Sequence, residues 1–180
     1  ARVLERGQFG ELEEQQRSFV KNIREAGEHM LNLVNDLLDY RRIEEGRLTL
    51  DLAPVDLDDV IQETLMLVRS DVDERGHSVE VDLPDDLPAL VTDRHATVRI
   101  LTNLVSNAAK YTEDGGRIII RASSGLRYIT VSVTDSGIGI APEDQERVFA
   151  YFEQIQTRLT GRSRGSGLGL ALTRQLVHRL

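Results

Sequence analysis

Asparagine side chains recur one helical turn apart in the segment 103–111, which reads NLVSNAAKY. A helix would place Asn103 and Asn107 on one face, and Lys110 would extend that face. Asparagine is a mediocre helix former, so two on one stripe need a reason. Amide oxygens can ligate Mg²⁺ and a lysine can meet a phosphate. The alternative is an ordinary solvated helix face.

Two glycine-rich segments follow. The first, Asp135–Ile140, comes directly after a predicted strand, and Asp135 can accept a hydrogen bond from the amino group of a base. Because glycine has no Cβ, a ligand can approach this backbone closely, although a strand-ending turn is the simpler alternative. The second, Gly165–Leu170, opens the last predicted helix, where N–H groups and the helix dipole favour phosphate oxygens. Ser166 adds a hydroxyl there.

A basic stretch, Thr157–Arg164, precedes the second glycine segment. Its arginines, Arg158, Arg162 and Arg164, stand among small polar residues. We predict a mobile lid that meets the charge of a triphosphate. The alternative is a solvated basic loop.

The glycine segments do not fit the common nucleotide motifs. The chain contains no Gly-x-x-x-x-Gly-Lys-Ser/Thr, and the dinucleotide pattern Gly-x-Gly-x-x-Gly is absent. The protein-kinase sets Val-Ala-Ile-Lys, His-Arg-Asp and Asp-Phe-Gly are missing as well. Any nucleotide site is therefore of another type.

Composition limits the remaining possibilities. The 180 residues are 40% hydrophobic and 29% charged, which suits one medium soluble domain plus an extra element. A net charge of −8 argues against a general nucleic-acid binder. There is no cysteine, hence no disulfide or thiolate metal site, and no apolar run long enough to span a bilayer. We expect a cytoplasmic protein.

A long helix must come first. From Leu12 to about Ile43 apolar residues alternate spacings of four and three, which is a heptad seam. The seam residues are Phe19, Ile23, Ala26, Met30, Leu33, Leu37 and Tyr40. Leu31, Val34 and Leu38 widen the stripe, which favours a four-helix bundle over a lone amphipathic helix. Gly46 is a plausible C-cap.

The rest of the chain predicts a separate α+β unit. Leu48–Leu52 alternates as a short strand, and the domain boundary lies between Gly46 and Pro54. Beyond it, helices and strands follow one another in an irregular order, which indicates a two-layer α/β sandwich with a mixed sheet. The predicted helices are Leu57–Glu74, a helix capped by Asp93 that runs to Tyr111, and Gly167–Leu180. The predicted strands are His77–Leu83, Ala89–Val91, Arg117–Ala122 and Tyr128–Thr134, and 135–166 is loop-rich with short helical stretches.

The three segments, in this order, resemble the N, G1 and G2 boxes of the histidine-kinase catalytic domain. That domain has the Bergerat fold, shared with type II topoisomerase, chaperone and mismatch-repair ATPases. Val148–Gln154 resembles the F box, and Gly27–Asp39 resembles the second helix of the dimerisation and histidine-phosphotransfer hairpin. The resemblance divides the chain into part of that hairpin (1–46), a linker strand (47–55) and an ATP-binding domain (56–180).

The resemblance implies a role for each box. Asn107 would ligate Mg²⁺, Asp135 would bind the adenine amino group, and the second glycine segment would hold the phosphates of ATP. The implied ATP-binding residues are Asn103, Asn107, Lys110, Tyr111, Asp135, Gly137, Ile138, Gly139, Phe152, Arg164, Gly165, Ser166, Gly167, Leu168 and Gly169. The implied partners are a second copy of the chain, joined through the heptad helix, and a response-regulator receiver domain.

Two parts of the family pattern are missing. The phosphoacceptor stretch, His-Glu-x-x-Thr-Pro-like, is absent, so we expect the acceptor upstream of Ala1. The four histidines, His29, His77, His95 and His178, are not expected to be acceptors. The closing β-hairpin of the family, which follows the last helix, is also absent.

The resemblance implies a kinase that transfers the γ-phosphate of ATP to a histidine, for relay to a response-regulator aspartate. A degenerate or phosphatase-biased nucleotide-binding module is a second possibility. Another Bergerat ATPase, such as an anti-sigma-factor serine kinase, is a third, although the heptad helix argues against it.

Overall fold

The computed structural model describes residues 13–126, 128–155 and 166–180. The chain divides into two compact units, Ala1–Arg47 and Leu48–Leu180. Within the described ranges, no helix is both long enough and apolar enough to cross a lipid bilayer.

In the described part of the first unit, the regular element is the helix α2, Glu14–Glu44. It ends because Gly46 adopts a left-handed φ of +66°, with the N–H of Gly46 bonded to Ile43 O and that of Arg47 to Arg42 O. These two bonds form a Schellman motif, so Gly46 stops the helix as predicted, one position beyond the C-cap Glu45.

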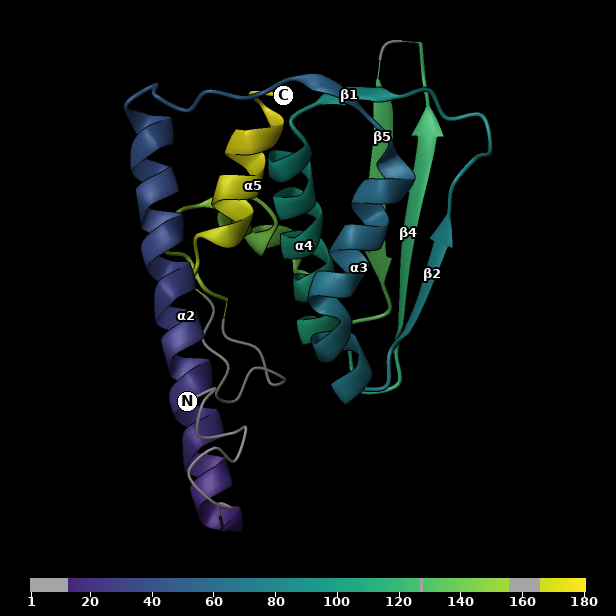
Figure 1. The fold of residues 1–180 in the computed structure, drawn as a ribbon. Coiled ribbons are helices and arrows are strands. Elements are labelled where there is room, and N and C mark those ends of the chain that lie inside the picture. The colour runs from purple at the N-terminus through teal and green to yellow at the C-terminus, as the bar shows by residue number, and fades with distance from the viewer. Residues whose placement is uncertain (1–12, 127, 156–165) are drawn as a thin grey trace. The chain divides into compact units, whose positions relative to one another are not determined.

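The second unit is an α/β sandwich (Figure 1). Its sheet has the order β2-β4-β5, with β2 parallel and β5 antiparallel to β4. The strands are β1 Ala53–Val55, β2 Ser78–Asp82, β3 Leu90–Thr92, β4 Arg117–Ser124 and β5 Ile129–Asp135. The helices are α3 Leu57–Glu74, α4 Arg94–Tyr111 and α5 Gly169–Val177, with short turns η1 Pro142–Asp144 and η2 Arg147–Phe149. The α+β two-layer prediction is confirmed.

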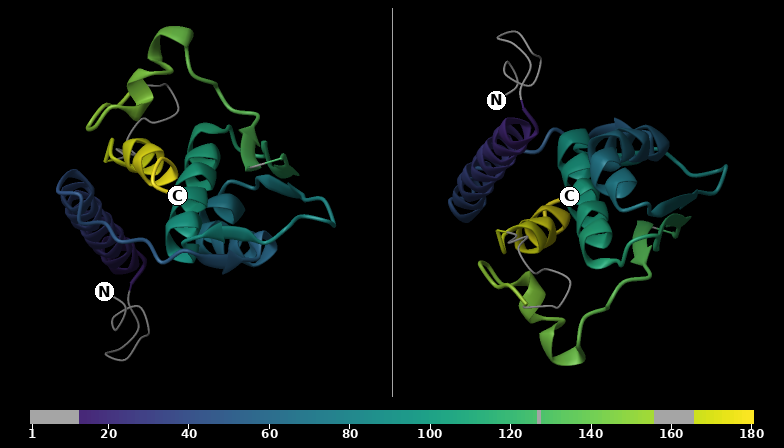
Figure 2. Two further views of the ribbon diagram at one scale, coloured as in Figure 1. Left: turned by 90° about the horizontal axis from the view of Figure 1, so that it is seen from above. Right: turned by 90° about the horizontal axis from the view of Figure 1, so that it is seen from below.

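The core lies between α3, α4 and one face of the sheet. Alternate residues of β4, Ile118 and Ile120, are fully buried, and Val60 and Ile61 of α3 are fully buried opposite them in the same cluster. The other sheet face carries cross-strand ion pairs, including Arg121 with Asp82 on β2. This alternation is the period-2 pattern of a sheet with one solvated face. Figure 2 shows α5 against α4 in both views.

The predicted strand over Leu48–Leu52 is wrong. The strand begins at Ala53 and continues through Pro54 to Val55, where it pairs antiparallel with the three residues of β3. Its length is set by that short partner, and Pro54 is tolerated because a two-stranded sheet has only edge strands. Upstream, Asp51 uses its N–H to contact Asp93 and not a strand. The other predicted elements are present, with ends shifted by at most three residues.

Asp93 fastens the start of α4 through both carboxylate oxygens. Oδ1 accepts the N–H of Ala96 at 2.9 Å, as an N-cap should, and Oδ2 accepts the N–H of Asp51 at 2.9 Å. Burial raises the pKa of Asp93, but the N–H groups of Ala96 and Asp51 outweigh it and hold the pKa below 3.8.

We predict that Asp93→Asn lowers the free energy of unfolding by about 0.5–2 kcal/mol near neutral pH, because an amide cannot accept both N–H groups. The folded pKa of Asp93 is depressed, so its contribution is present above the unfolded value of 3.8 and is lost as pH falls through the folded value. Urea unfolding at a series of pH values should show the variant and the wild type converging in acid. Asp51→Asn, which keeps its backbone N–H, is the control. A difference independent of pH would contradict this account.

Candidate functional site

The helix α4 carries four of the predicted site residues: Asn103, Asn107, Lys110 and Tyr111, all half-buried. A helix rises 1.5 Å per residue, so Asn103 and Tyr111 stand about 12 Å apart along the axis. Asn107 lies between them. Each end of this stretch contacts one of the two glycine segments.

At Asn103, α4 contacts the start of α5. The Nδ2 of Asn103 donates to Thr173 Oγ1 at 2.9 Å. Gly169 packs so closely that a Cβ there would lie 2.3 Å from Asn103 Oδ1. The Asn103 amide therefore joins α4 to α5, which places the second glycine segment beside the face that bears Asn107.

At Tyr111, α4 contacts the first glycine segment. The N–H of Ile138 donates to Tyr111 O at 3.3 Å, and a Cβ on Gly137 would lie 2.4 Å from the same oxygen. Asp135 Oδ1 accepts the N–H of Gly137 at 2.9 Å. Asp135 is exposed and a carboxylate has further acceptor capacity, so it can still receive a hydrogen bond from a ligand.

The two glycines of the first segment, Gly137 and Gly139, have different structural roles. Gly137 is required by the protein itself, because its missing Cβ makes room for the end of α4. Gly139 has a left-handed φ of +67° and open space where a Cβ would be. Ile138 and Ile140 beside it are exposed, at 45% and 47%. These two exposed apolar side chains lie within five residues of Asp135 in the sequence, and such side chains suit the flat face of a base.

A backbone clasp joins Phe152 to Gly167. The N–H of Phe152 donates to Gly167 O at 2.9 Å, and a Cβ on Gly167 would lie 2.8 Å from the Phe152 carbonyl carbon. Both residues have left-handed φ, +64° for Phe152 and +68° for Gly167. Ser166 Oγ accepts the N–H of Leu168 at 3.1 Å. The clasp thus fixes the backbone directly before α5.

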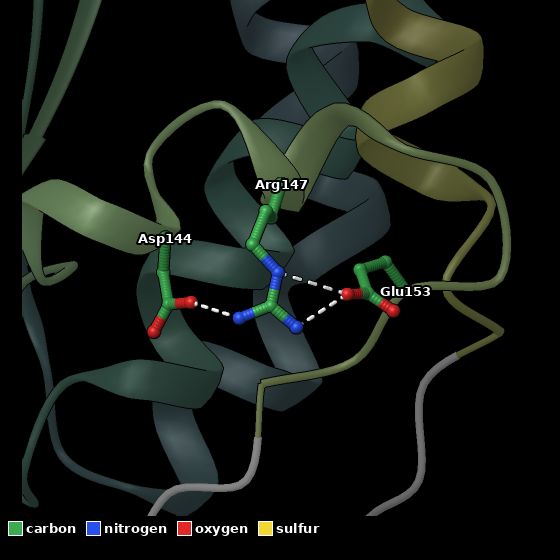
Figure 3. Close-up of polar contacts among 3 residues, drawn as sticks. All are labelled: Asp144, Arg147 and Glu153. Atoms are coloured by element: carbon green, nitrogen blue, oxygen red, sulfur yellow. Dashed lines mark hydrogen bonds and ion pairs between the residues drawn. The ribbon is translucent and has the colours of Figure 1, made fainter.

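Arg147 holds the segment that leads to this clasp (Figure 3). Its Nη1 donates to Asp144 Oδ1 at 2.5 Å and its Nε to Glu153 Oε1 at 3.0 Å. Arg147 therefore ties η1 to the residue that follows Phe152. A second link runs from η2 to α5, where the guanidinium of Arg174 lies 5.5 Å from the centre of the Phe149 ring.

The start of α5 has the properties of an anion site. The side chain of the N-cap residue, Leu168, makes no capping hydrogen bond, and the first turn of α5 contains no acidic residue, so no acid of this helix offsets the positive end of its dipole. Lys110, on α4, is a second source of positive charge. Burial is the main cause that lowers the pKa of Lys110, and the positive charge of Arg75 lowers it further. Burial raises the pKa of Tyr111. The Lys110 ammonium lies 5.2 Å from the centre of the Tyr111 ring.

Asn107 fits a Mg²⁺ that arrives with a nucleotide. Mg²⁺ commonly takes one or two protein ligands and completes its shell with phosphate and water oxygens. Across the part of the chain that the structure describes, no three His, Cys, Asp or Glu side chains gather into a metal site. A single amide oxygen such as that of Asn107 could share a Mg²⁺ with phosphate and water oxygens.

Some predicted residues lie outside the described ranges. Arg164 and Gly165 do, as does the rest of the predicted lid.

The sequence did not predict every contact that holds the candidate site together. Thr173, the partner of Asn103, lies one turn after Gly169, and that spacing could have indicated it. Two hollows, one between the start of α3 and the β2–β3 loop and one between η2 and α5, are lined by none of the predicted ligand residues.

Known families match both parts of the chain. Residues 1–46 match the His Kinase A (phospho-acceptor) domain, and residues 92–180 match the histidine kinase-, DNA gyrase B- and HSP90-like ATPase family. Among solved structures, the mycobacterial sensor histidine kinase MprB is 30% identical with a TM-score of 0.60, over 72% of this chain and 80% of that one. The chain belongs to the sensor histidine kinases.

Other histidine kinases are similar to nearly the whole of this chain. Full-length ShkA in complex with AMPPNP is 32% identical, with a TM-score of 0.77 over 96% of this chain and 35% of that one. The circadian input-output histidine kinase CikA of Synechococcus elongatus is 38% identical over 97% of this chain and 24% of its own length. The histidine protein kinase DivJ of Caulobacter vibrioides is 36% identical over 96% and 29%. The chain thus spans less than a third of these curated relatives.

We predict that Gly137→Ala destabilises the ATPase-type domain of this histidine kinase by about 1–3 kcal/mol. The new Cβ would meet the carbonyl of Tyr111, which is backbone and cannot swing away. Urea unfolding followed by circular dichroism measures the loss. Gly27→Ala on α2 is the control, since a Cβ there meets open space and a helical alanine is favoured. Equal stability of the two variants would contradict the packing role of Gly137.

Proposed function

We propose that the chain holds Mg²⁺·ATP and passes its γ-phosphate to a histidine, for relay to a response-regulator aspartate. One observation carries the proposal. The two glycine segments contact opposite ends of one stretch of α4, and Asn107 lies between them. A nucleotide laid along this stretch would place its base at one end and its phosphates at the other.

Each end offers the chemistry that its part of the nucleotide needs. Asp135 would accept the adenine amino group, with Ile138 and Gly139 against the ring. Asn107 would bind Mg²⁺, with Lys110 and Tyr111 lining the same side. The start of α5, Ser166–Gly169, would hold phosphate oxygens with its N–H groups, and Arg164, Gly165 and Phe152 would complete the set. That ShkA was solved with AMPPNP supports this assignment.

Phosphoryl transfer needs mainly positioning and charge neutralisation. Mg²⁺, when bound at Asn107, would supply part of the neutralisation. The residues of this chain would supply the rest by orienting the triphosphate between Lys110 and the start of α5. The match of 1–46 to a phospho-acceptor domain supports an acceptor in that domain. We propose the divisions 1–46, 47–55 and 56–180 for the hairpin part, the linker and the ATP-binding domain, and a cytoplasmic site of action.

We predict that Asn107→Ala weakens ATP binding about tenfold or more in the presence of Mg²⁺ and changes it little when Mg²⁺ is chelated, because the metal links this amide to the phosphates. Isothermal titration with ATP, with and without Mg²⁺, measures both terms. Ser106→Ala is the matched control on the same helix, since its hydroxyl contacts Asp71 of α3.

Radiolabelled ATP tests the transfer itself, in the longer protein that includes an acceptor histidine. Acid-labile label that is lost in Asn107→Ala supports the kinase. Nucleotide binding without label transfer would contradict it and favour a regulatory nucleotide-binding module.

We also propose that α2 pairs with a second copy of the chain, as its match to the His Kinase A domain suggests. Its heptad residues are Phe19, Ile23, Ala26, Met30, Leu33 and Leu37, and four of them, Phe19, Ile23, Met30 and Leu37, expose 47–67% of their surface in the single chain. An apolar seam of this length needs cover.

We predict that Ile23→Asp converts a dimer to a monomer, because the seam would then bury an unpaired charge. Sedimentation velocity measures the mass. Asn22→Asp, one position away and outside the heptad seam, should leave the dimer intact. A wild-type monomer, or a dimeric Ile23→Asp, would contradict the pairing.

A further inference from the structure

The end of α4 has carbonyl oxygens that the helix itself leaves without a partner. Three of them, on Ala109, Lys110 and Tyr111, have partners outside the helix. Ala108 O accepts the N–H of the C-cap residue, Thr112, at 3.1 Å, which is the last bond of the helix itself, whereas Tyr111 O accepts the N–H of Ile138. The two between them are taken by side chains of the α3–β2 turn: Ala109 O by His77 Nε2 at 2.9 Å and Lys110 O by Arg75 Nη1 at 3.3 Å.

The turn that supplies these side chains is itself held on several sides. Gly76 has a left-handed φ of +64°, and its N–H bonds back to Asp73 O at 3.1 Å. The N–H of His77 bonds to Val72 O at 3.1 Å. Arg75 O accepts the N–H of Gly115 at 2.8 Å, from the loop after α4. The donors therefore approach α4 from a fixed backbone.

We propose that Arg75 and His77 are positioning residues for the nucleotide site. They fix the α4 end whose next carbonyl, that of Tyr111, anchors the loop bearing Asp135 and Gly139. The consequence for ligand binding rests on the proposed function. The two hydrogen bonds from Arg75 and His77 to the end of α4, which we call the clamp, are a property of the chain without ligand.

His77 is the more informative of the two. It is only 8% exposed, and its Nδ1 is buried without a partner among the described residues. A carbonyl can only accept, so Nε2 carries the proton. Burying an imidazole with one unmatched nitrogen costs free energy, and the hydrogen bond from Nε2 to Ala109 O offsets part of that cost. An apolar side chain would fill the same space but would orphan that carbonyl.

Arg75 adds charge as well as a donor. Its guanidinium lies beside the carbonyl of Lys110, and its positive charge is the second cause, after burial, of the lowered pKa of Lys110. Asp114, at 4.0 Å from Arg75 Nη1, is only a loose counterion. An incoming phosphate near Lys110 would therefore meet the field of two cations.

The test compares His77→Leu with His77→Gln, because the glutamine amide restores a donor near Ala109 O and leucine does not. His178→Leu, an exposed histidine at the end of α5, is the control. Hydrogen exchange of the ligand-free 180-residue chain reads the clamp. We expect His77→Leu to lose protection at the Thr112 and Ile138 amides while α3 keeps its own, and His77→Gln to recover it. Loss spread evenly over α3 and the sheet would indicate general destabilisation and overturn the positioning role.

Titration with Mg²⁺·ATP reads the consequence. We expect about tenfold weaker binding for His77→Leu, with recovery in His77→Gln and no change in His178→Leu. If the wild type binds and His77→Leu binds equally well, the inference fails and the proposed function stands. If the wild type does not bind ATP, the proposed function fails, and with it the role of the clamp in binding.

Discussion

A helix leaves its last four carbonyl oxygens without partners, and in α4 that requirement organises the site. The α3–β2 turn answers two of them, through Arg75 and His77, and the first glycine loop answers a third at Tyr111. The loop that carries Asp135 is therefore held where it is by a backbone bond to the helix that carries Asn107. The contacts that satisfy the end of this helix are also the contacts that bring together the residues of the candidate ligand site.

The glycines show how the sequence can be right about a residue for an incomplete reason. Glycine was expected to let a ligand reach the backbone, and Gly139, with open space about it, remains suited to that. Gly137, Gly167 and Gly169 are required first by neighbours of the protein itself, each of which a Cβ would strike. Asn103 is similar, because its amide contacts Thr173. In the structure without ligand, these motif residues already contact other parts of the protein, and those contacts alone explain their residue types.

Local signals predicted most of the fold, because caps and periodicity are local. Asp93 as the N-cap of α4 and Gly46 as the stop of α2 were both readable from the chain and are confirmed. The strand over Leu48–Leu52 failed because pairing depends on a partner, and β3 offers only three residues. His77 and Arg147 were missed for a related reason: their partners, Ala109 and Glu153, are determined by the fold or by a turn and leave no periodic trace.

The parallel pairing of β2 with β4 has a consequence for how the protein is made. Ser78 lies opposite Arg117, and β3 and α4 occupy the chain between them. Contacts so distant in sequence form slowly, since a long loop must close first. During synthesis, β2 waits for β4 to emerge, and Tyr111 O waits for Ile138. Until that point the chain contains helix α4 but lacks the loop that bears Asp135.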